Sequence, residues 1–191
     1  QKIGFCLLWA LSCFICYLPR FVRYGLLRPF ITLVFRLVGY RKGVILRNLR
    51  RSFSEKSDKE IKRIMRANYV TLAEAVVNTI SLIGANPKRT GNALICDNTE
   101  EHIERTKGRD WIVMPAHYGC WEYYPLWCWK DSSCDFISVY HPMKSPVFEH
   151  FFRRIRNYGD NNFLVTMNDA VRYYIKHRDK GRNMVLGLIS D

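Results

Sequence analysis

The stretch DFISVYHPMKSPVFEHFFRRIRNYGDNNFLVTM, residues 135–167, decides the fold class. Its two apolar ends, 135–140 and 162–167, have the length and the composition of buried strands. The segment 146–158 between them is amphipathic and predicts a helix. That helix has three boundary signals: Ser145 as N-cap, Pro146 at the first helical position and Gly159 after the end. A strand, a helix and a strand in this order predict two parallel strands joined by a crossover.

The same alternation continues outward from this unit. We expect three further strands, at 93–96, 111–114 and 184–189. Further helical stretches are expected at 99–106, 121–129 and 169–180. Continuous apolar strands that alternate with helices are typical of a sheet whose two faces are both covered. The sequence therefore predicts an α/β fold with a mostly parallel sheet.

A long amphipathic helix is expected before this α/β part. Ser57 and Glu60 have the spacing of a capping box, apolar residues then recur at helical spacing, and Gly84 is placed to end the helix. We accordingly divide the chain into a basic apolar region (1–53), this helix (54–85) and an α/β core (86–191). Because the last strand ends close to Asp191, we expect the core to continue in a longer protein.

The first region combines apolar and basic residues. Ile3–Leu18 is uncharged, but as a helix it would span only about 24 Å of a hydrocarbon core about 30 Å thick. Of the net charge of +13, residues 1–70 hold almost all, with 15 Lys/Arg against three Asp/Glu. An apolar anchor followed by basic amphipathic helices indicates attachment to an anionic membrane surface, on its cytoplasmic side. Nucleic-acid binding by the same arginines is the alternative interpretation, but a nucleic-acid-binding module would have no use for the uncharged segment.

The seven cysteines predict neither a disulfide framework nor a metal site. Their number is odd, three lie in the apolar N-terminal segment, and no pair has zinc-ribbon spacing with a second pair downstream. We interpret them as buried or cytosolic thiols. No cofactor is expected.

His117 and Glu122 are the candidate catalytic pair. His117 follows the predicted strand 111–114 by three residues, at the carboxyl end where reactive groups of α/β sheets collect. Gly119 lets the backbone fold back, so that Glu122 in the next helix can reach the imidazole. A carboxylate on one ring nitrogen would leave the other as a general base. From spacing alone, a polar turn in which His117 caps the helix stays open.

Four blocks of this chain resemble the family of lipid A biosynthesis acyltransferases. The blocks are the apolar N-terminus leading into GYRKGVILRNLRRSFSEKSDKEIKRIM, then HYGCWE, then VYHPMKSPVFEHFFRRIRNYG, and finally LGLISD. The resemblance covers nearly the whole chain, and it is the order of the blocks that is specific. The family belongs to the wider group of glycerolipid acyltransferases that carry a His-x4-Asp/Glu motif.

The resemblance implies a reaction and a set of residues. His117 would deprotonate a hydroxyl of a membrane lipid acceptor, most simply a lipid A precursor, and Glu122 would orient it. The acyl chain would come from an acyl-carrier protein or CoA thioester, at the cytoplasmic face of a bacterial inner membrane. Arg154 or Arg156 would bind phosphate or developing negative charge, and Asp191 matches the Asp of a family Asp-Gln pair. We assign the remaining substrate contacts to Gly119, Trp121 and Tyr140.

The chain departs from the family pattern at three positions. Cys120 stands where Asn is common, His141 near a usual Arg, and Ser145 near a usual Asn. The first change leaves open a Cys120–His117 nucleophilic pair. Two further alternatives are an acyltransferase for another lipid, such as a lysophospholipid or an aminolipid, and a membrane-tethered chain without activity.

Overall fold

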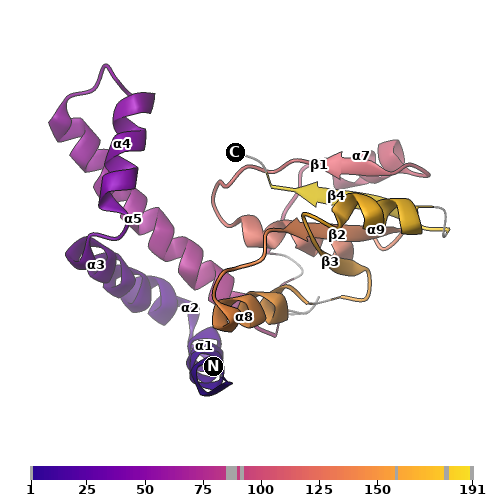
Figure 1. Ribbon diagram of the computed structural model, residues 1–191, viewed down its shortest axis with the longest axis horizontal. Coiled ribbons are helices and arrows are strands. Elements are labelled where there is room, and N and C mark those ends of the chain that lie inside the picture. The colour runs from indigo at the N-terminus through magenta and orange to yellow at the C-terminus, as the bar shows by residue number, and fades with distance from the viewer. Residues whose placement is uncertain (1, 85–89, 91–92, 158, 179–180, 190–191) are drawn as a thin grey trace. The chain divides into compact units, whose positions relative to one another are not determined.

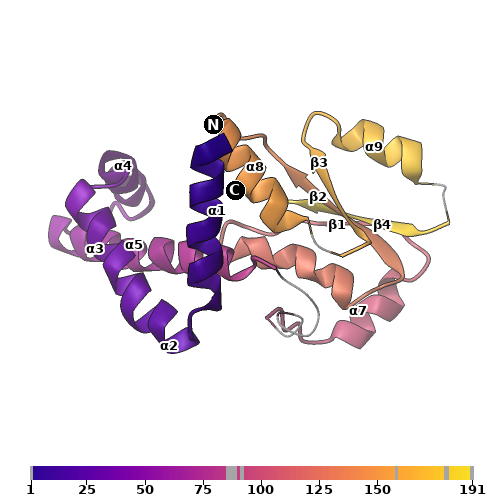
Figure 2. The ribbon, with the colours of Figure 1, turned by 90° about the horizontal axis from the view of Figure 1, so that it is seen from below.

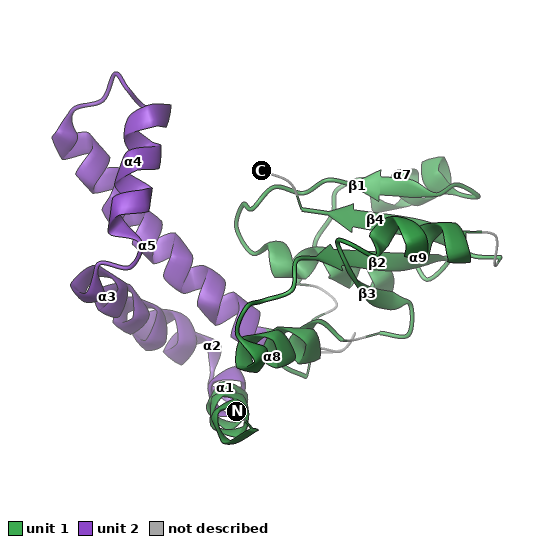
Figure 3. Ribbon diagram, in the orientation of Figure 1, with its two compact units in different colours: residues 1–13, 82–191 green, residues 14–81 purple. Residues whose placement is uncertain are grey.

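The computed structural model describes residues 2–84, 90, 93–157, 159–178 and 181–189 (Figure 1). It divides into two compact units (Figure 3). Unit 1 comprises residues 1–13 and 82–191, and unit 2 comprises residues 14–81. The first helix, α1 (Lys2–Tyr17), begins in unit 1 and ends in unit 2.

Unit 1 is built on a parallel four-stranded sheet in the order β1-β4-β2-β3. The strands are β1 (Trp111–Val113), β2 (Cys134–Tyr140), β3 (Asn162–Thr166) and β4 (Asn183–Leu188). This confirms four of the predicted strands and the α/β class. The predicted strand 93–96 is wrong: these residues are bends and coil, Ile95 is 82% exposed, and the segment lines a cavity instead of joining the sheet.

Helices cover both faces of this sheet. A 3₁₀ helix, η2 (Trp121–Trp129), links β1 to β2, and α8 (Pro146–Arg156) links β2 to β3. From β3 the chain returns through α9 (Ala170–His177) to β4. Because parallel crossovers are right-handed, the reversal of direction puts α9 on the opposite face. Figure 2 shows α9 on one side of the sheet and α7 (Thr99–Thr106) on the other.

The buried core follows the two-residue period of the strands. Ile137 of β2, Val165 of β3 and Met184 of β4 pack with Ala170 under α9. Phe136, the neighbour of Ile137, is buried too and lines the cavity on the side of α7. The strands are therefore apolar on both faces, as the uninterrupted apolar runs predicted.

The helix after β1 has an unexpected geometry. The segment 121–129 is helical as predicted, but it is 3₁₀ throughout. Pro125 lies inside it, and a proline has no N–H for the bond that an α-helix would make there. The tighter geometry still buries Glu122, Leu126, Trp127 and Cys128.

Unit 2 is helical. Its elements after α1 are α2 (Arg20–Val22), η1 (Arg23–Leu27), α3 (Arg28–Val38), α4 (Lys42–Ser52) and α5 (Asp58–Ser81). The long helix and its capping box are confirmed, since the hydroxyl and the N–H of Ser57 donate to Glu60 Oε2 at 2.7 and 3.0 Å. Polar pairs join η1 and α3 to α5: Tyr24 with Asn78, Arg23 with Ser81, and Arg28 with Glu74 at 3.3 Å.

None of the helices in the described residues is, by itself, both long and apolar enough to cross a membrane. The segments Lys2–Tyr17 and Arg20–Val38 meet the length and composition criteria only as a pair, and they are bent by 115° at the break.

Candidate active site

The carboxyl edge of the sheet carries the predicted site. β1 ends at Val113, and the loop after it holds His117, which is exposed to solvent. Gly119 has φ of +63°, in the left-handed region that glycine adopts without strain. This is the turn that the sequence analysis expected there, and it leads the chain directly into η2.

Glu122, in the first turn of η2, is paired with Arg156 at the end of α8. Arg156 Nε donates to Glu122 Oε2 at 2.8 Å, and Nη2 donates to Oε1 at 2.5 Å. Glu122 is only 6% exposed, so this two-pronged ion pair is largely shielded from water. Paired hydrogen bonds between charged groups are the strong kind, and they are what makes burial of two charges tolerable.

Arg156 keeps its positive charge in this pair. Burial opposes the charge on Arg156, but the hydrogen bonds from it to Glu122 and the negative charge of that carboxylate outweigh burial, and the pKa of Arg156 is raised. Arg156 is thus a positive charge held in one position by Glu122, and η2, which carries Glu122, directly follows the loop of His117.

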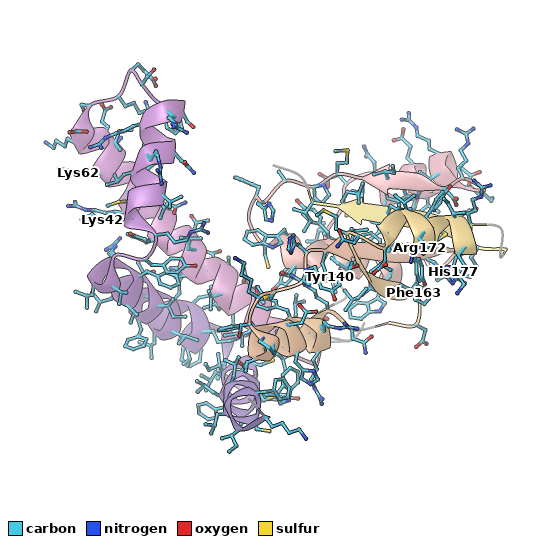
Figure 4. The ribbon with its side chains drawn as sticks, in the orientation of Figure 1. Lys42, Lys62, Tyr140, Phe163, Arg172 and His177 are labelled. Atoms are coloured by element: carbon cyan, nitrogen blue, oxygen red, sulfur yellow. The ribbon has the colours of Figure 1, made fainter. Side chains whose placement is uncertain are left out.

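Tyr140 extends this cluster to the next strand. It is the last residue of β2 (Figure 4), and the guanidinium of Arg156 lies 5.9 Å from the centre of its ring. The phenol of Tyr140 donates to Glu149 Oε1 at 2.9 Å, while Glu149 Oε2 accepts from the N–H of Met143 at 2.9 Å. Burial and this hydrogen bond raise the pKa of Tyr140. Glu149 was not among the site residues predicted from the sequence. Its position as the acidic residue in the first turn of α8 was the signal that could have indicated it.

Two contacts of the predicted site residues can be compared: Glu122 with Arg156, and His117 with Trp121. Within the described part of the chain, the hydrogen bonds of Glu122 come from Arg156, a residue 34 positions away. The ring of His117 packs edge-on against Trp121, with 5.0 Å between the centroids. The pairing of Glu122 with Arg156 was missed because spacing along the chain cannot show which distant helix end approaches η2.

The two arginines that the sequence left as alternatives have different surroundings. Arg154 lies over the ring of Trp9 in α1, 4.6 Å from its centre, on a face of α8 where Phe151 also contacts Trp9. Arg156 faces Glu122 and Tyr140 instead. Asp191 lies outside the described residues.

A cavity of about 520 Å³ opens between η2, α7 and the sheet. Its lining includes Trp111 and Val113 of β1 and Tyr124 and Trp127 of η2. The two elements that flank the His117 loop therefore also form part of the cavity wall. The remaining lining residues are Leu94, Ile95, Cys96, Asp97, Asn98, Glu101, His102, Arg105 and Phe136. Most of the wall is apolar, as in pockets that take apolar ligands.

The described cysteines have no arrangement for metal binding. Within the described ranges, no three His, Cys, Asp or Glu side chains gather as ligands. Cys128 and Cys134 are buried, and burial raises the pKa of each thiol to about 12, which keeps it protonated. Cys120, beside His117 in the sequence, is half-buried.

One comparison with known proteins identifies a relationship. The family model described as "Bacterial lipid A biosynthesis acyltransferase" matches residues 1–191. A search of the curated proteins finds none that matches.

Proposed function

Because the chain belongs to the family of bacterial lipid A biosynthesis acyltransferases, we propose that it moves an acyl chain from a carrier-protein or CoA thioester to a hydroxyl of a lipid A precursor. The observation that carries this proposal is the buried ion pair of Glu122 and Arg156 next to the loop of His117. Glu122 of this pair lies on η2, the element that follows the loop of the exposed His117, at the edge of the sheet where reactive groups collect.

His117 is the general base of the proposed reaction. A nitrogen of its imidazole takes the proton of the acceptor hydroxyl while that oxygen attacks the carbonyl carbon of the thioester. The new C–O bond forms, the C–S bond breaks, and the leaving thiolate takes the proton back from the imidazolium. No acyl-enzyme is formed, and no cofactor is needed.

Arg156 supplies positive charge in this proposal. A guanidinium has five N–H donors, and Glu122 accepts from two of its nitrogens, which leaves donors for a substrate oxygen. An arginine held in one position can stabilise negative charge on the thioester oxygen or on a phosphate without rearranging. Glu122 therefore acts on the site mainly through Arg156, in addition to the role toward His117 that the sequence suggests.

We place the acyl chain in the cavity between η2 and α7. About 520 Å³ is within the range of cavities that enclose small ligands, and the wall is largely aromatic and aliphatic. Trp111 and Val113 precede the His117 loop, and Tyr124 follows it, so a chain bound there has its reactive end close to that loop. Trp121 adjoins the same loop through its contact with His117.

The N-terminal helices support a position at the cytoplasmic face of the inner membrane. In α1, Ile3, Leu7, Leu11 and Phe14 recur on one face and are all exposed. In unit 2, Leu26, Phe30, Leu33 and Leu37 form a second exposed stripe, in a segment that also carries Arg28 and Arg36. Leucine and phenylalanine beside arginine are typical of helices that lie in the bilayer interface.

The test compares labelled lipid extracts from cells that express the full-length protein or its His117→Ala variant. We expect the variant to lose the acylated lipid A product, and turnover of the purified protein to fall by about 10² to 10⁴-fold, the usual contribution of a general base. An unchanged acyl pattern would show that His117 is not catalytic. Label in a lysophospholipid or aminolipid product would instead identify another acceptor.

Cys120→Ala is the matched control, since it changes the same loop. If His117 is the base, turnover by this variant stays within a few-fold of wild type. A loss as large as that of His117→Ala would favour the nucleophilic pair.

A further inference from the structure

The outer face of α9 and the turn before it expose apolar side chains that the proposed function has not used: Val171 and Ile175 lie on the helix, and Met167 lies in the turn after β3. Met167, Val171 and Ile175 are spaced by four residues and are 58%, 69% and 59% exposed. Four residues separate neighbours on one helical face. The opposite face of α9, with Ala170, Tyr173 and Tyr174, packs on the sheet. We call Met167, Val171 and Ile175 the α9 stripe.

Positive charge lies along one side of this stripe and at its end. Arg172 (labelled in Figure 4), Lys176 and Arg178 are exposed, and the sequence has no carboxylate between Ala170 and Arg178. On a helical wheel, Arg172 and Lys176 lie to one side of the stripe, and Arg178 falls on the stripe itself. Apolar side chains flanked by cations fit a partner with apolar residues flanked by carboxylates.

The stripe begins at the same edge of the sheet as the candidate active site. The N–H of Met167 donates to the carbonyl of Tyr140 at 2.9 Å, and Tyr140 lies beside Arg156. A partner bound along α9 from Met167 therefore reaches the carboxyl ends of the strands. That position suits a protein that has to present a thioester there.

We propose that α9 docks the acidic carrier protein that delivers the acyl chain, through the α9 stripe and the cations Arg172, Lys176 and Arg178. This proposal rests on the proposed function and adds a partner surface to it. The carrier would present a helix with apolar side chains between carboxylates.

A protein partner fits this face better than a membrane does. The stripe has two side chains on a helix of eight residues and one in the turn before it, and none of them is Leu, Phe or Trp, the residues that anchor interfacial helices. Such anchors occur instead in α1 and α3. Methionine, in contrast, is common on surfaces that adapt to protein partners.

The first experiment reverses the charges. The full-length Arg172→Glu/Lys176→Glu variant is assayed with acyl-carrier protein and with acyl-pantetheine, a neutral donor without the protein. We expect KM for the carrier donor to rise about tenfold or more and its dependence on salt to weaken, because steering charges are lost. Turnover of acyl-pantetheine should not change. Lys107→Glu/Arg109→Glu, an equal charge change on exposed residues before β1, is the control and should leave both donors unaffected.

The second experiment separates this proposal from the proposed function. Binding of the holo-carrier is measured without turnover, by calorimetry, for wild type, the charge reversal and Val171→Ser/Ile175→Ser. Weaker binding by both variants, with folding verified by circular dichroism, supports docking on α9 even if no donor is turned over, an outcome that would contradict only the proposed function. Unchanged binding by both variants overturns the docking proposal. An equal loss of turnover with both donors also overturns it. So does a result in which the variants bind anionic vesicles more weakly but bind the carrier as wild type does.

Discussion

The two units arrange charge in opposite ways. In unit 1, Glu122 and Arg156 are held in a shielded two-pronged pair at one point of the sheet. In unit 2, charged residues lie on the surface beside exposed Leu and Phe, and a typical pair, Arg50 with Asp58 at 3.1 Å, is 55% and 70% exposed. A shielded pair acts strongly on a small region, whereas a spread of exposed cations acts weakly on a large partner. The difference is consistent with the chemistry proposed for unit 1 and the membrane contact proposed for unit 2.

The largest expected effect is the loss of the pair in unit 1. Arg156→Ala leaves the carboxylate of Glu122 buried without a partner, which typically costs about 3–5 kcal/mol of folding stability. We also expect its turnover to be abolished. The measurement is the free energy of unfolding in urea, with activity assayed under conditions where the variant is folded.

Arg50→Ala in unit 2 is the matched control. Exposed pairs contribute at most about 1 kcal/mol, so this variant should be close to wild type in stability and in turnover. Equal losses of stability in the two variants would remove the contrast between the units.

A smaller effect is expected from the exposed apolar residues of unit 2. Leu33→Ser/Leu37→Ser should weaken binding to vesicles that contain anionic lipid by about tenfold or more, since burial of each leucine contributes about 1.5–3 kcal/mol when complete. Stability should not fall, because both side chains are exposed. Co-sedimentation with vesicles is the measurement.

Val171→Ser/Ile175→Ser on α9 makes an equivalent change to an exposed apolar face in unit 1. It should leave vesicle binding unaffected. If it weakened vesicle binding as much as the unit 2 variant, the assignment of membrane contact to the N-terminal helices would be wrong.

Local signals predicted elements better than they predicted partners. The caps around α8 and α5 and the apolar runs of four strands were sufficient because each is a property of a few adjacent residues. The run 93–96 failed because four apolar residues can line a cavity as readily as they can form a strand, and only tertiary packing decides between them.

The prediction of the site was limited in the same way, because local signals indicated positions but not the contacts made by tertiary packing. The position of His117 after β1 and the turn at Gly119 followed from the sequence. The partner of Glu122 did not, because the approach of Arg156 depends on how α8 crosses the sheet.

The smallest expected effect concerns the start of α5, where a carboxylate in unit 2 is exposed instead of shielded. Hydrogen bonds from the hydroxyl and N–H of Ser57 lower the pKa of Glu60 below 4.5. A lowered pKa in the folded state means that the contribution of Glu60 to stability is present above its unfolded pKa and is lost as pH falls through the folded one. The protection of amides in the first turn of α5, measured relative to their intrinsic exchange rate at each pH, should therefore fall on acidification below about pH 4.5. Glu60→Gln should remove that dependence, because an amide does not titrate, whereas in Lys59→Gln it should persist. If acidification left the protection of this turn unchanged in the wild type, the capping box would not hold the helix start in solution.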